Sequence, residues 1–559
     1  MVTNSIQPYR RMIQISMKFF PSLLVCLALS EWDETTAFLP TSKHVLRTDT
    51  QTQQARFPIR QFAAFEGSSD DNVAVDNEFR TTNSTSHSTD GGLALSSPGE
   101  AIQRLGLKTG PTVWTEFNRI GQEHNPVNLG QGFPDWLPPK FAVDSLVEAV
   151  LDSAQSPHQY TRSAGHPNLV NQLARRYSIH MRKEIDPMNE VAVTVGASQA
   201  LYLSLQTLVR PGDEVILFEP FFDLYVNQVK LAGGTPVFVP LRFVPYTDKI
   251  DGQDEDEVRG GDWVLDRDEL MKVVSPRTKA IILNSPHNPT GKIFTRTEME
   301  LIAESLDLAG PDCVVLSDEV YKYIIHAPPK EESVSDSPIC AGHIHFASLP
   351  GMWDRTITIS SAGKTFSATG WQAGWCVGPN RLIKPIHQLL PYIQFCASTV
   401  IQEAPARSLD RADQPYEGYA SYYEYLKAKY TRKRDLLVDA LTEAGFAVPN
   451  YDVTPGGGFF ILARPGKAIQ RSIPEKYILA KNEAAPGGVA RQDWALCQWM
   501  AEEVGLLCIP SSPFFSSERV QEGAADSFIR VAFCKTDETI EAAAAALRQM
   551  KVLEEVVVE

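Results

Sequence analysis

The sequence predicts an α/β fold, with a mostly parallel sheet between two layers of helices, from about residue 101 onward. Short apolar runs alternate with segments of helical length, and Gly, Pro, Asp and Asn bound these runs. The runs carry apolar residues on both faces, which is typical of parallel strands covered by helices on both sides. The expected strands cover residues 191–195, 214–218, 280–283, 314–316 and 356–359.

Composition excludes several classes of protein. The 559 residues allow one large enzyme with appendages, and 43% hydrophobic residues suffice for a sizeable core. The net charge of −16 has the wrong sign for binding phosphate backbones, so we expect no nucleic-acid partner. The eight cysteines form no C-x-x-C pair, and we expect no metal site.

Residues 1–65 have the pattern of a targeting presequence. Residues 1–30 contain no Asp or Glu, carry Arg10, Arg11 and Lys18, and then become apolar. That apolar run is too short to span a bilayer permanently, so we expect no stable membrane association. Small residues precede Phe38, and a basic tract follows it. This order resembles the bipartite presequences of algae with complex plastids and predicts a plastid location, with secretion, the mitochondrion or the cytoplasm as alternatives.

Polar segments interrupt or precede the α/β pattern. Residues 66–100 are rich in Ser, Asn, Asp and Gly and are predicted to form a disordered linker. Residues 248–262, 328–338 and 464–488 are predicted to be solvated surface loops.

Two motifs at expected strand ends carry the most chemical information. Lys364 follows Ser360-Ser361-Ala362-Gly363, directly after the expected strand 356–359. A lysine in such a position can have the lowered pKa that a Schiff-base amine needs. Asp318 ends another buried strand, and Tyr321 follows three residues later. Ligand groups gather at such carboxyl ends in parallel sheets.

Two further segments add an amide and an anion site. Asn288 lies in a rigid turn, Asn284-Ser285-Pro286-His287-Asn288-Pro289, after the strand 280–283. Ser198 lies where a strand passes through Gly196 into a helix, and a helix N-terminus can bind phosphate. Each motif alone also fits a simpler role: a surface lysine, a helix cap with a packed tyrosine, or a plain loop.

Taken together, these motifs resemble the class I, fold type I pyridoxal-phosphate aminotransferases. Within that family the sequence is similar to the kynurenine aminotransferases, also known as glutamine transaminase K and cysteine-S-conjugate β-lyase. The resemblance extends over about residues 105–550, in the family's order. The segments that carry it, besides those above, are residues 128–135 (NLGQGFPD), 158–161 (HQYT), 219–225 (EPFFDLY), 348–353 (SLPGMW) and 528–531 (FIRV).

The resemblance implies a role for each matching residue. Lys364 would be the Schiff-base lysine and proton-transfer base, and Asp318 would hold the ring nitrogen of the cofactor, pyridoxal 5′-phosphate, protonated. Arg530 would clamp the substrate carboxylate through two hydrogen bonds. The other implied cofactor contacts are Tyr321 and Asn288 at the ring hydroxyl, Phe222 on the ring face, Ser198, Gln199 and Ser361 at the phosphate, and Tyr160 from a second subunit. The other implied substrate contacts are Gly132, Trp114, Asn288, Tyr225 and Phe395.

Two positions depart from the family pattern. Gln372 stands where the family usually has a lysine or arginine that neutralises the cofactor phosphate, so we expect weaker cofactor retention. Cys396 stands where related sequences often have a histidine near the substrate, which leaves the side-chain preference open.

The resemblance further implies a homodimer with two domains per subunit. The large domain, residues 145–420, would hold a seven-stranded, mostly parallel sheet, and residues 101–144 with 421–559 would form a smaller α/β domain. The implied reaction moves an amino group from kynurenine, glutamine, methionine or an aromatic amino acid to a 2-oxo acid. A β-lyase acting on cysteine conjugates, an aminotransferase of other specificity and, more remotely, a non-catalytic protein that kept the fold are the alternatives.

Overall fold

The computed structural model describes residues 99–106, 111–154, 157–245, 260–326, 342–449, 456–480, 482, 485, 491–524 and 528–557. These residues belong to one compact unit, 82–559. The expected presequence 1–65 lies outside the described residues, as does the expected linker apart from residues 99 and 100, and so does the expected loop 328–338.

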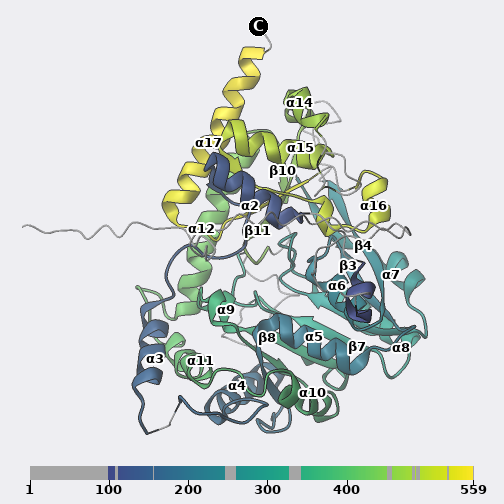
Figure 1. The fold of residues 1–559 in the computed structure, drawn as a ribbon, viewed down its shortest axis with the longest axis vertical. Coiled ribbons are helices and arrows are strands. Elements are labelled where there is room, and N and C mark those ends of the chain that lie inside the picture. Colours follow the sequence, from purple (N-terminus) through teal and green to yellow (C-terminus); the bar gives the residue numbers. More distant parts are fainter. Residues whose placement is uncertain are drawn as a thin grey trace, which may run out of the picture. The chain divides into compact units, whose positions relative to one another are not determined.

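A seven-stranded sheet forms the centre of the fold (Figure 1). In sheet order its strands are β4 (Thr235–Pro245), β3 (Glu214–Glu219), β6 (Thr278–Asn284), β7 (Val314–Asp318), β8 (Thr356–Ser361), β9 (Ala373–Val377) and β2 (Val191–Val195). Neighbours from β4 to β8 pair in parallel, and β9 pairs antiparallel with both β8 and β2. The predicted α/β fold with a mostly parallel sheet is confirmed.

Apolar residues on both faces of each central strand explain why this sheet is buried between helices. Val215 and Leu217 of β3 pack in one hydrophobic cluster, whereas Ile216 and Phe218 of the same strand pack in another. Alternate residues point to opposite faces of a strand, so both faces must be covered.

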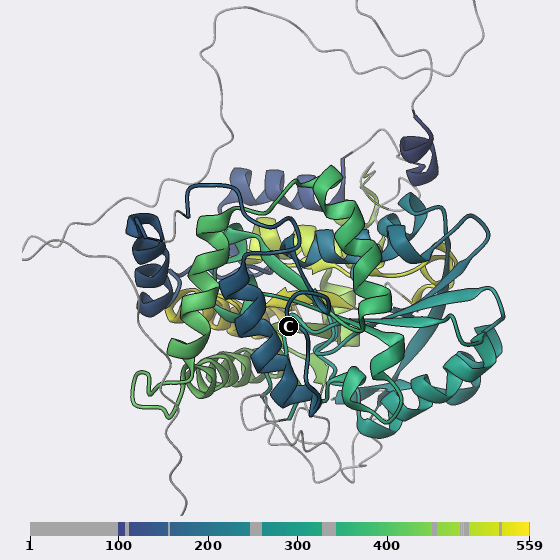
Figure 2. The ribbon, with the colours of Figure 1, turned by 90° about the horizontal axis from the view of Figure 1, so that it is seen from below.

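Helices cover the two faces separately. The first cluster includes side chains from α5 (Gly196–Leu208), α6 (Leu224–Leu231) and α10 (Asn380–Ile393). The second includes side chains from α7 (Arg267–Val273) and α8 (Arg296–Ala309). At the β2 and β9 edge pack α10, α4 (Pro167–Met181) and α11 (Thr399–Ala412), and α11 also contacts α3 (Lys140–Leu151) (Figure 2).

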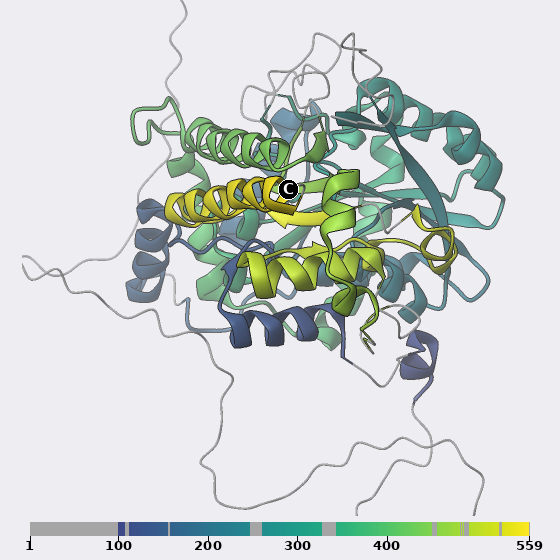
Figure 3. The same cartoon turned by 90° about the horizontal axis from the view of Figure 1, so that it is seen from above.

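Five further strands continue the sheet beyond β4. In order they are β5 (Gly260–Leu265), β10 (Phe446–Pro449), β11 (Phe460–Pro465), β14 (Ile529–Ala532) and β13 (Ile509–Pro510). The long helices α12 (Tyr422–Glu443) and α17 (Asp537–Val557) pack against each other beside them (Figure 3). A separate parallel pair, β1 (Val127–Asn128) with β12 (Leu506–Leu507), joins the N-terminal segment to the C-terminal part of the chain.

The remaining helices are α1 (Glu100–Leu105), α2 (Val113–His124), α9 (Ala362–Thr365), α13 (Lys467–Ser472), α14 (Glu475–Ile478), α15 (Gln492–Trp499) and α16 (Ser517–Gln521). Among the described helices, none combines the length and the apolar character needed to cross a membrane.

Two expected loops are partly wrong. The stretch 464–488 contains α13 and α14, because Ile469 and Tyr477 anchor these short helices in the core despite the nearby Gly and Pro. The acidic stretch 248–262 ends in β5, which pairs antiparallel with β4. The domain limits 101–144, 145–420 and 421–559 stay predictions.

Candidate active site

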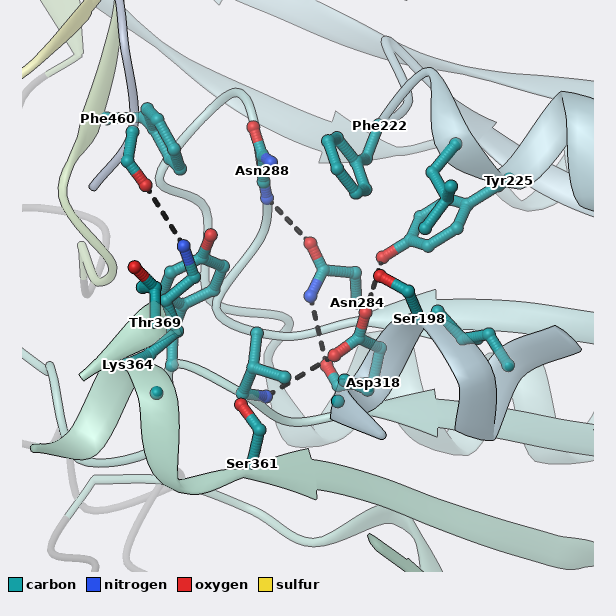
Figure 4. A pocket seen from close by; sticks show the side chains of 18 of the residues that line it. Ser198, Phe222, Tyr225, Asn284, Asn288, Asp318, Ser361, Lys364, Thr369 and Phe460 are labelled. Atoms are coloured by element: carbon teal, nitrogen blue, oxygen red, sulfur yellow. Dashed lines mark hydrogen bonds between the residues drawn. The ribbon is translucent and has the colours of Figure 1, made fainter. Parts of the chain in front are cut away.

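A cavity of about 250 Å³ lies at the carboxyl ends of β6, β7 and β8 and at the start of α5 (Figure 4). This is the position where parallel sheets bind ligands, because strand ends and helix N-termini converge there. The structure brings together most of the predicted site residues in its lining: Trp114, Gly132, Ser198, Phe222, Tyr225, Asn288, Asp318, Tyr321, Ser361, Lys364, Gln372 and Arg530.

Lys364 reaches into this cavity from the short helix α9 that follows β8. Its Nζ donates a hydrogen bond to the carbonyl oxygen of Gly132 at 3.0 Å and lies within 6 Å of the Tyr321 and Phe459 ring centres. Burial of the ammonium group lowers the pKa of Lys364 to about 8. An appreciable fraction of this amine is therefore neutral near neutral pH, as a nucleophilic amine requires.

Asp318, at the end of β7, is held by its neighbours in one orientation. The Tyr225 hydroxyl donates to Asp318 Oδ2 at 2.7 Å, and the Asn284 side-chain amide donates to the Asp318 carbonyl oxygen at 3.0 Å. Burial raises the pKa of Asp318 to about 6, against the effect of the Tyr225 hydrogen bond. A buried carboxylate with so few donors is suited to binding a protonated ring nitrogen.

The opposite end of the cavity offers uncharged donors. Gly196, Ala197 and Ser198 begin α5, and no side chain caps this helix end. The first backbone N–H groups of a helix have no intrahelical partner and attract anions. Ser361 and Thr369 also line the cavity. The arrangement fits a phosphate group.

Gln372 lies at this same end, as its alignment with the family predicts. Its side-chain amide donates to the Thr369 carbonyl oxygen at 2.7 Å. A methyl group added at Gly196 would lie 2.6 Å from Gln372 Oε1, so the carboxamide lies against the start of α5. Among the described residues that line the cavity, the only cationic side chains are Lys364 and Arg530.

Arg530, on β14, closes the cavity beside its aromatic walls. One guanidinium nitrogen donates to the Gly130 carbonyl oxygen at 3.0 Å, and Nε is buried without a hydrogen-bond partner. The rings of Trp114, Phe460 and Phe514 lie about 5 Å from the guanidinium carbon. Burial lowers the pKa of Arg530 to about 10, yet it stays charged near neutral pH and can bind a carboxylate.

The aromatic walls explain the position of Gly132. A methyl group added there would lie 2.4 Å from the Phe460 ring, so only glycine allows this chain segment to approach. The Trp114 indole N–H donates to the Asp223 carboxylate at 2.8 Å, which fixes the ring beside the cavity.

Three predicted contacts do not line the cavity of the described chain. Gln199 accepts a hydrogen bond from the Val195 backbone N–H at 2.6 Å and thereby supports the strand-to-helix turn. Tyr160 and Phe395 are 82% and 56% exposed, and their ring centres are 4.8 Å apart. A role for this aromatic pair at a cavity requires a second subunit.

Sequence reasoning missed several lining residues. Asn284 belongs to the motif around Asn288, and its position directly after a strand could have revealed it. Thr369 and Phe460 gave no comparable signal, because they enter the cavity only through the packing of distant segments.

The donor set fits the predicted cofactor, pyridoxal 5′-phosphate. Lys364 could bind its aldehyde carbon, Asp318 its ring nitrogen, and the start of α5 its phosphate, while Phe222 offers a ring face.

An α/β fold that gathers a buried lysine, a buried aspartate and a buried arginine around one cavity has the groups needed for amine chemistry on a carboxylate-bearing substrate. The family model for "Aminotransferase class I and II" matches residues 124–547. The chain therefore belongs to the class I and II aminotransferase family, and the predicted aminotransferase function is confirmed.

The chain is also similar to named members of this family. The chain is 38% identical to the kynurenine–oxoglutarate transaminase of Dictyostelium discoideum over 443 residues, which is 79% of this chain and 94% of that protein. It is 38% identical to human kynurenine–oxoglutarate transaminase 3, over 77% of this chain and 86% of that protein. A solved structure of YbdL from Escherichia coli, whose title assigns a methionine aminotransferase function, superposes with a TM-score of 0.62 at 28% identity, over 80% of this chain and 98% of that one.

Proposed function

We propose that this aminotransferase uses pyridoxal 5′-phosphate to move the amino group of kynurenine, glutamine, methionine or an aromatic amino acid to a 2-oxo acid. The observation that carries this proposal is the convergence of Lys364, Asp318 and Arg530 on one cavity with aromatic walls. Relatives named for kynurenine and methionine support the donor class.

Each residue contributes a separate part of the reaction. When bound, pyridoxal phosphate supplies an electron-withdrawing ring that stabilises the charge developing at the substrate α-carbon. Arg530 binds the α-carboxylate and so fixes the α-carbon relative to Lys364. Lys364 Nζ accepts the α-proton and can return it, which its lowered pKa permits near neutral pH. The rings of Trp114 and Phe460 give the cavity apolar walls beside Arg530.

Absorbance spectroscopy tests the cofactor and the donor class together. The purified protein should show the absorbance of lysine-bound pyridoxal phosphate. Kynurenine, glutamine, methionine and phenylalanine should convert it to the pyridoxamine form, and a 2-oxo acid should reverse the change. Release of pyruvate from a cysteine conjugate would reveal β-lyase activity. A protein that binds no pyridoxal phosphate would refute the proposal.

The proposed assembly is a homodimer in which Tyr160 completes the partner's site. Val143, Val147 and Val150 are exposed on α3, and the Tyr160–Phe395 pair is also exposed. Apolar side chains exposed in this way are typical of an interface.

A mixed dimer tests whether Tyr160 acts across that interface. Lys364→Ala and Tyr160→Ala homodimers should both be impaired. Mixing and refolding them should restore activity, because one of the two sites then contains both native residues. No recovery in verified mixed dimers would exclude a shared site.

For the location, we propose import into a plastid. A reporter fused behind residues 1–70 should enter the plastid of an alga with a complex plastid, and substitution of Phe38 should block the last import step. An enzyme that begins near residue 100 should fold and transaminate normally, because the preceding segment has little core-forming content.

A further inference from the structure

A group of buried polar side chains lies behind the active site, and the proposed reaction uses none of them. Glu319, Lys322, His343 and His345 are at most 2% exposed. None of the four lines the active-site cavity. Because burial of charged groups costs several kcal/mol unless they are compensated, their presence calls for an explanation.

The carboxylate of Glu319 accepts hydrogen bonds from His345 and Ser317 and lies within ion-pair distance of His343. His345 Nδ1 lies 2.5 Å from Glu319 Oε2, and His343 Nε2 lies 3.2 Å from the same oxygen. The Ser317 hydroxyl donates to Oε1 at 2.9 Å. These neighbours hold the pKa of Glu319 well below its usual range in spite of burial, so Glu319 is charged.

The ammonium group of Lys322 supplies the opposite charge. Its Nζ donates to the Tyr177 hydroxyl at 2.5 Å and to the Ser360 hydroxyl at 3.1 Å. The Tyr177 hydroxyl also accepts from the Trp375 indole at 3.1 Å. Lys322 is thereby tied to helix α4 and to strands β8 and β9.

Ser360 connects this group to the strands that carry the reacting residues. The Ser360 hydroxyl donates to the Glu319 carbonyl oxygen at 3.3 Å. The Glu319 backbone N–H donates to the Ile359 carbonyl oxygen at 2.9 Å. Asp318 is the last residue of β7 and directly precedes Glu319, and Lys364 follows Ser360 of β8 by four residues. The contacts therefore join the two chain segments at the point where each enters the active site.

We propose that Glu319, Lys322, His343 and His345 form a positioning network that sets the placement of Lys364 relative to Asp318. The network rests on the proposed function, since it matters only if these two residues act on one bound cofactor.

Charge balance favours a proton-bearing network over a metal site. The ligand atoms of Glu319, His343 and His345 lie within 4.8 Å of one another, which a metal ion could use. However, the group already holds the positive charge of Lys322, which together with burial lowers the pKa of His343 to about 4. A divalent cation would add two further positive charges beside Lys322, with only the Glu319 carboxylate of this group to offset them, which is costly in a dry interior.

The test uses two variants with matched controls. Ser360→Ala removes the connecting hydroxyl without changing charge, and Glu319→Gln removes the charge. Their controls are Ser408→Ala and Glu403→Gln on α11. Ser408 is equally buried with its hydroxyl on a backbone carbonyl, and Glu403 is a buried carboxylate paired with His166 at 2.8 Å. No residue of α11 lines the cavity.

For the full-length enzyme with pyridoxal phosphate, kcat, the KM of the amino donor and the pH midpoint of the cofactor absorbance are measured. We expect kcat to fall about tenfold in Glu319→Gln and about threefold in Ser360→Ala, with KM changed less than about twofold. The absorbance midpoint should shift by about half a pH unit or more, while both controls keep native values.

The outcomes separate the network from the proposed function. The enzyme could bind pyridoxal phosphate while both variants keep the kinetic constants and absorbance midpoint of their controls. That result would overturn the positioning network but not the proposed function. An unsubstituted enzyme without pyridoxal phosphate would overturn both proposals. Stoichiometric zinc, with chelation reproducing the loss of kcat, would show a metal site instead. If Glu319→Gln does not fold, Ser360→Ala decides.

Discussion

Lys364 shows how its surroundings convert an ordinary side chain into a reactive one. A lysine in water is almost fully protonated at neutral pH, whereas burial lowers the pKa of Lys364 to about 8. The positive charge of Arg530 lowers the pKa of Lys364 further, whereas the carboxylate of Asp318 raises it. The balance leaves an amine that can both bind a carbonyl carbon and carry a proton.

Replacement of Lys364 by alanine should abolish transamination, because no other side chain of the described cavity wall offers an amine. Cofactor bound without a covalent bond could remain. Borohydride reduction of the native enzyme followed by peptide mapping should place the pyridoxyl label on Lys364. A label on another lysine would disprove the assignment.

Gln372 lies beside the start of α5, where the family's cation would balance the phosphate charge. A charge-assisted hydrogen bond contributes about 1.5–3 kcal/mol against about 1 kcal/mol for a neutral one. Gln372→Lys should therefore tighten pyridoxal phosphate binding by about tenfold, measured as cofactor retained during dialysis. Gln372→Met is the control that loses the hydrogen bond and should weaken retention. Unchanged retention in Gln372→Lys would mean that residue 372 does not act on the phosphate.

At the scale of elements, the active site depends on how closely β9 approaches the start of α5. A methyl group added at Gly374 of β9 would lie 2.2 Å from the Gly196 carbonyl carbon and 2.6 Å from the Ala197 nitrogen. Both are backbone atoms, which cannot move without displacing the helix.

Gly374→Ala should therefore push the N-terminus of α5 away from the cavity. We expect loss of cofactor retention and a decrease of about 1–3 kcal/mol in the free energy of unfolding. Dialysis and urea denaturation measure the two effects. Gly370→Ala is the control, because an added methyl group there meets no atom within 4 Å. Equal behaviour of the two variants would contradict this packing argument.

At the scale of the whole molecule, buried histidines make the fold sensitive to acid. Burial lowers the pKa of His287 and His326 to about 3 and that of His343 to about 4, from 6.5. Below about pH 6.5 these histidines are protonated in the unfolded chain but stay neutral in the native protein. The free energy of unfolding should then fall by about 1.4 kcal/mol per pH unit for each of them. Asp318, whose pKa is raised to about 6, and Glu219, whose pKa is also raised by burial, act in the opposite direction, but the buried histidines outnumber them.

The urea midpoint should therefore decrease steadily from pH 7 to pH 5. His326→Gln should make this decrease shallower, because one of the buried histidines no longer titrates. A midpoint independent of pH over this range would show that these histidines accept protons in the native state.

The sequence by itself determined the class of fold and the chemistry of the main site. Residues 280–283, 314–316 and 356–359 are apolar on both faces, and this local pattern needs no tertiary contact to predict a buried parallel sheet. Lys364, Asp318 and Asn288 were recognisable because each follows such a strand, and the carboxyl ends of parallel strands meet at one edge.

Tertiary structure alone decided which distant segments complete the site. Phe460 reaches the cavity and Tyr225 bonds Asp318 only because segments far apart in the chain pack together. The short helices α13 and α14 form where Gly and Pro predicted a loop, since burial of Ile469 and Tyr477 outweighs local propensity. Likewise, Glu319 meets His343 and His345 across two dozen residues. Local sequence patterns report the period of an element, whereas contacts between elements depend on the packing of side chains from the whole chain.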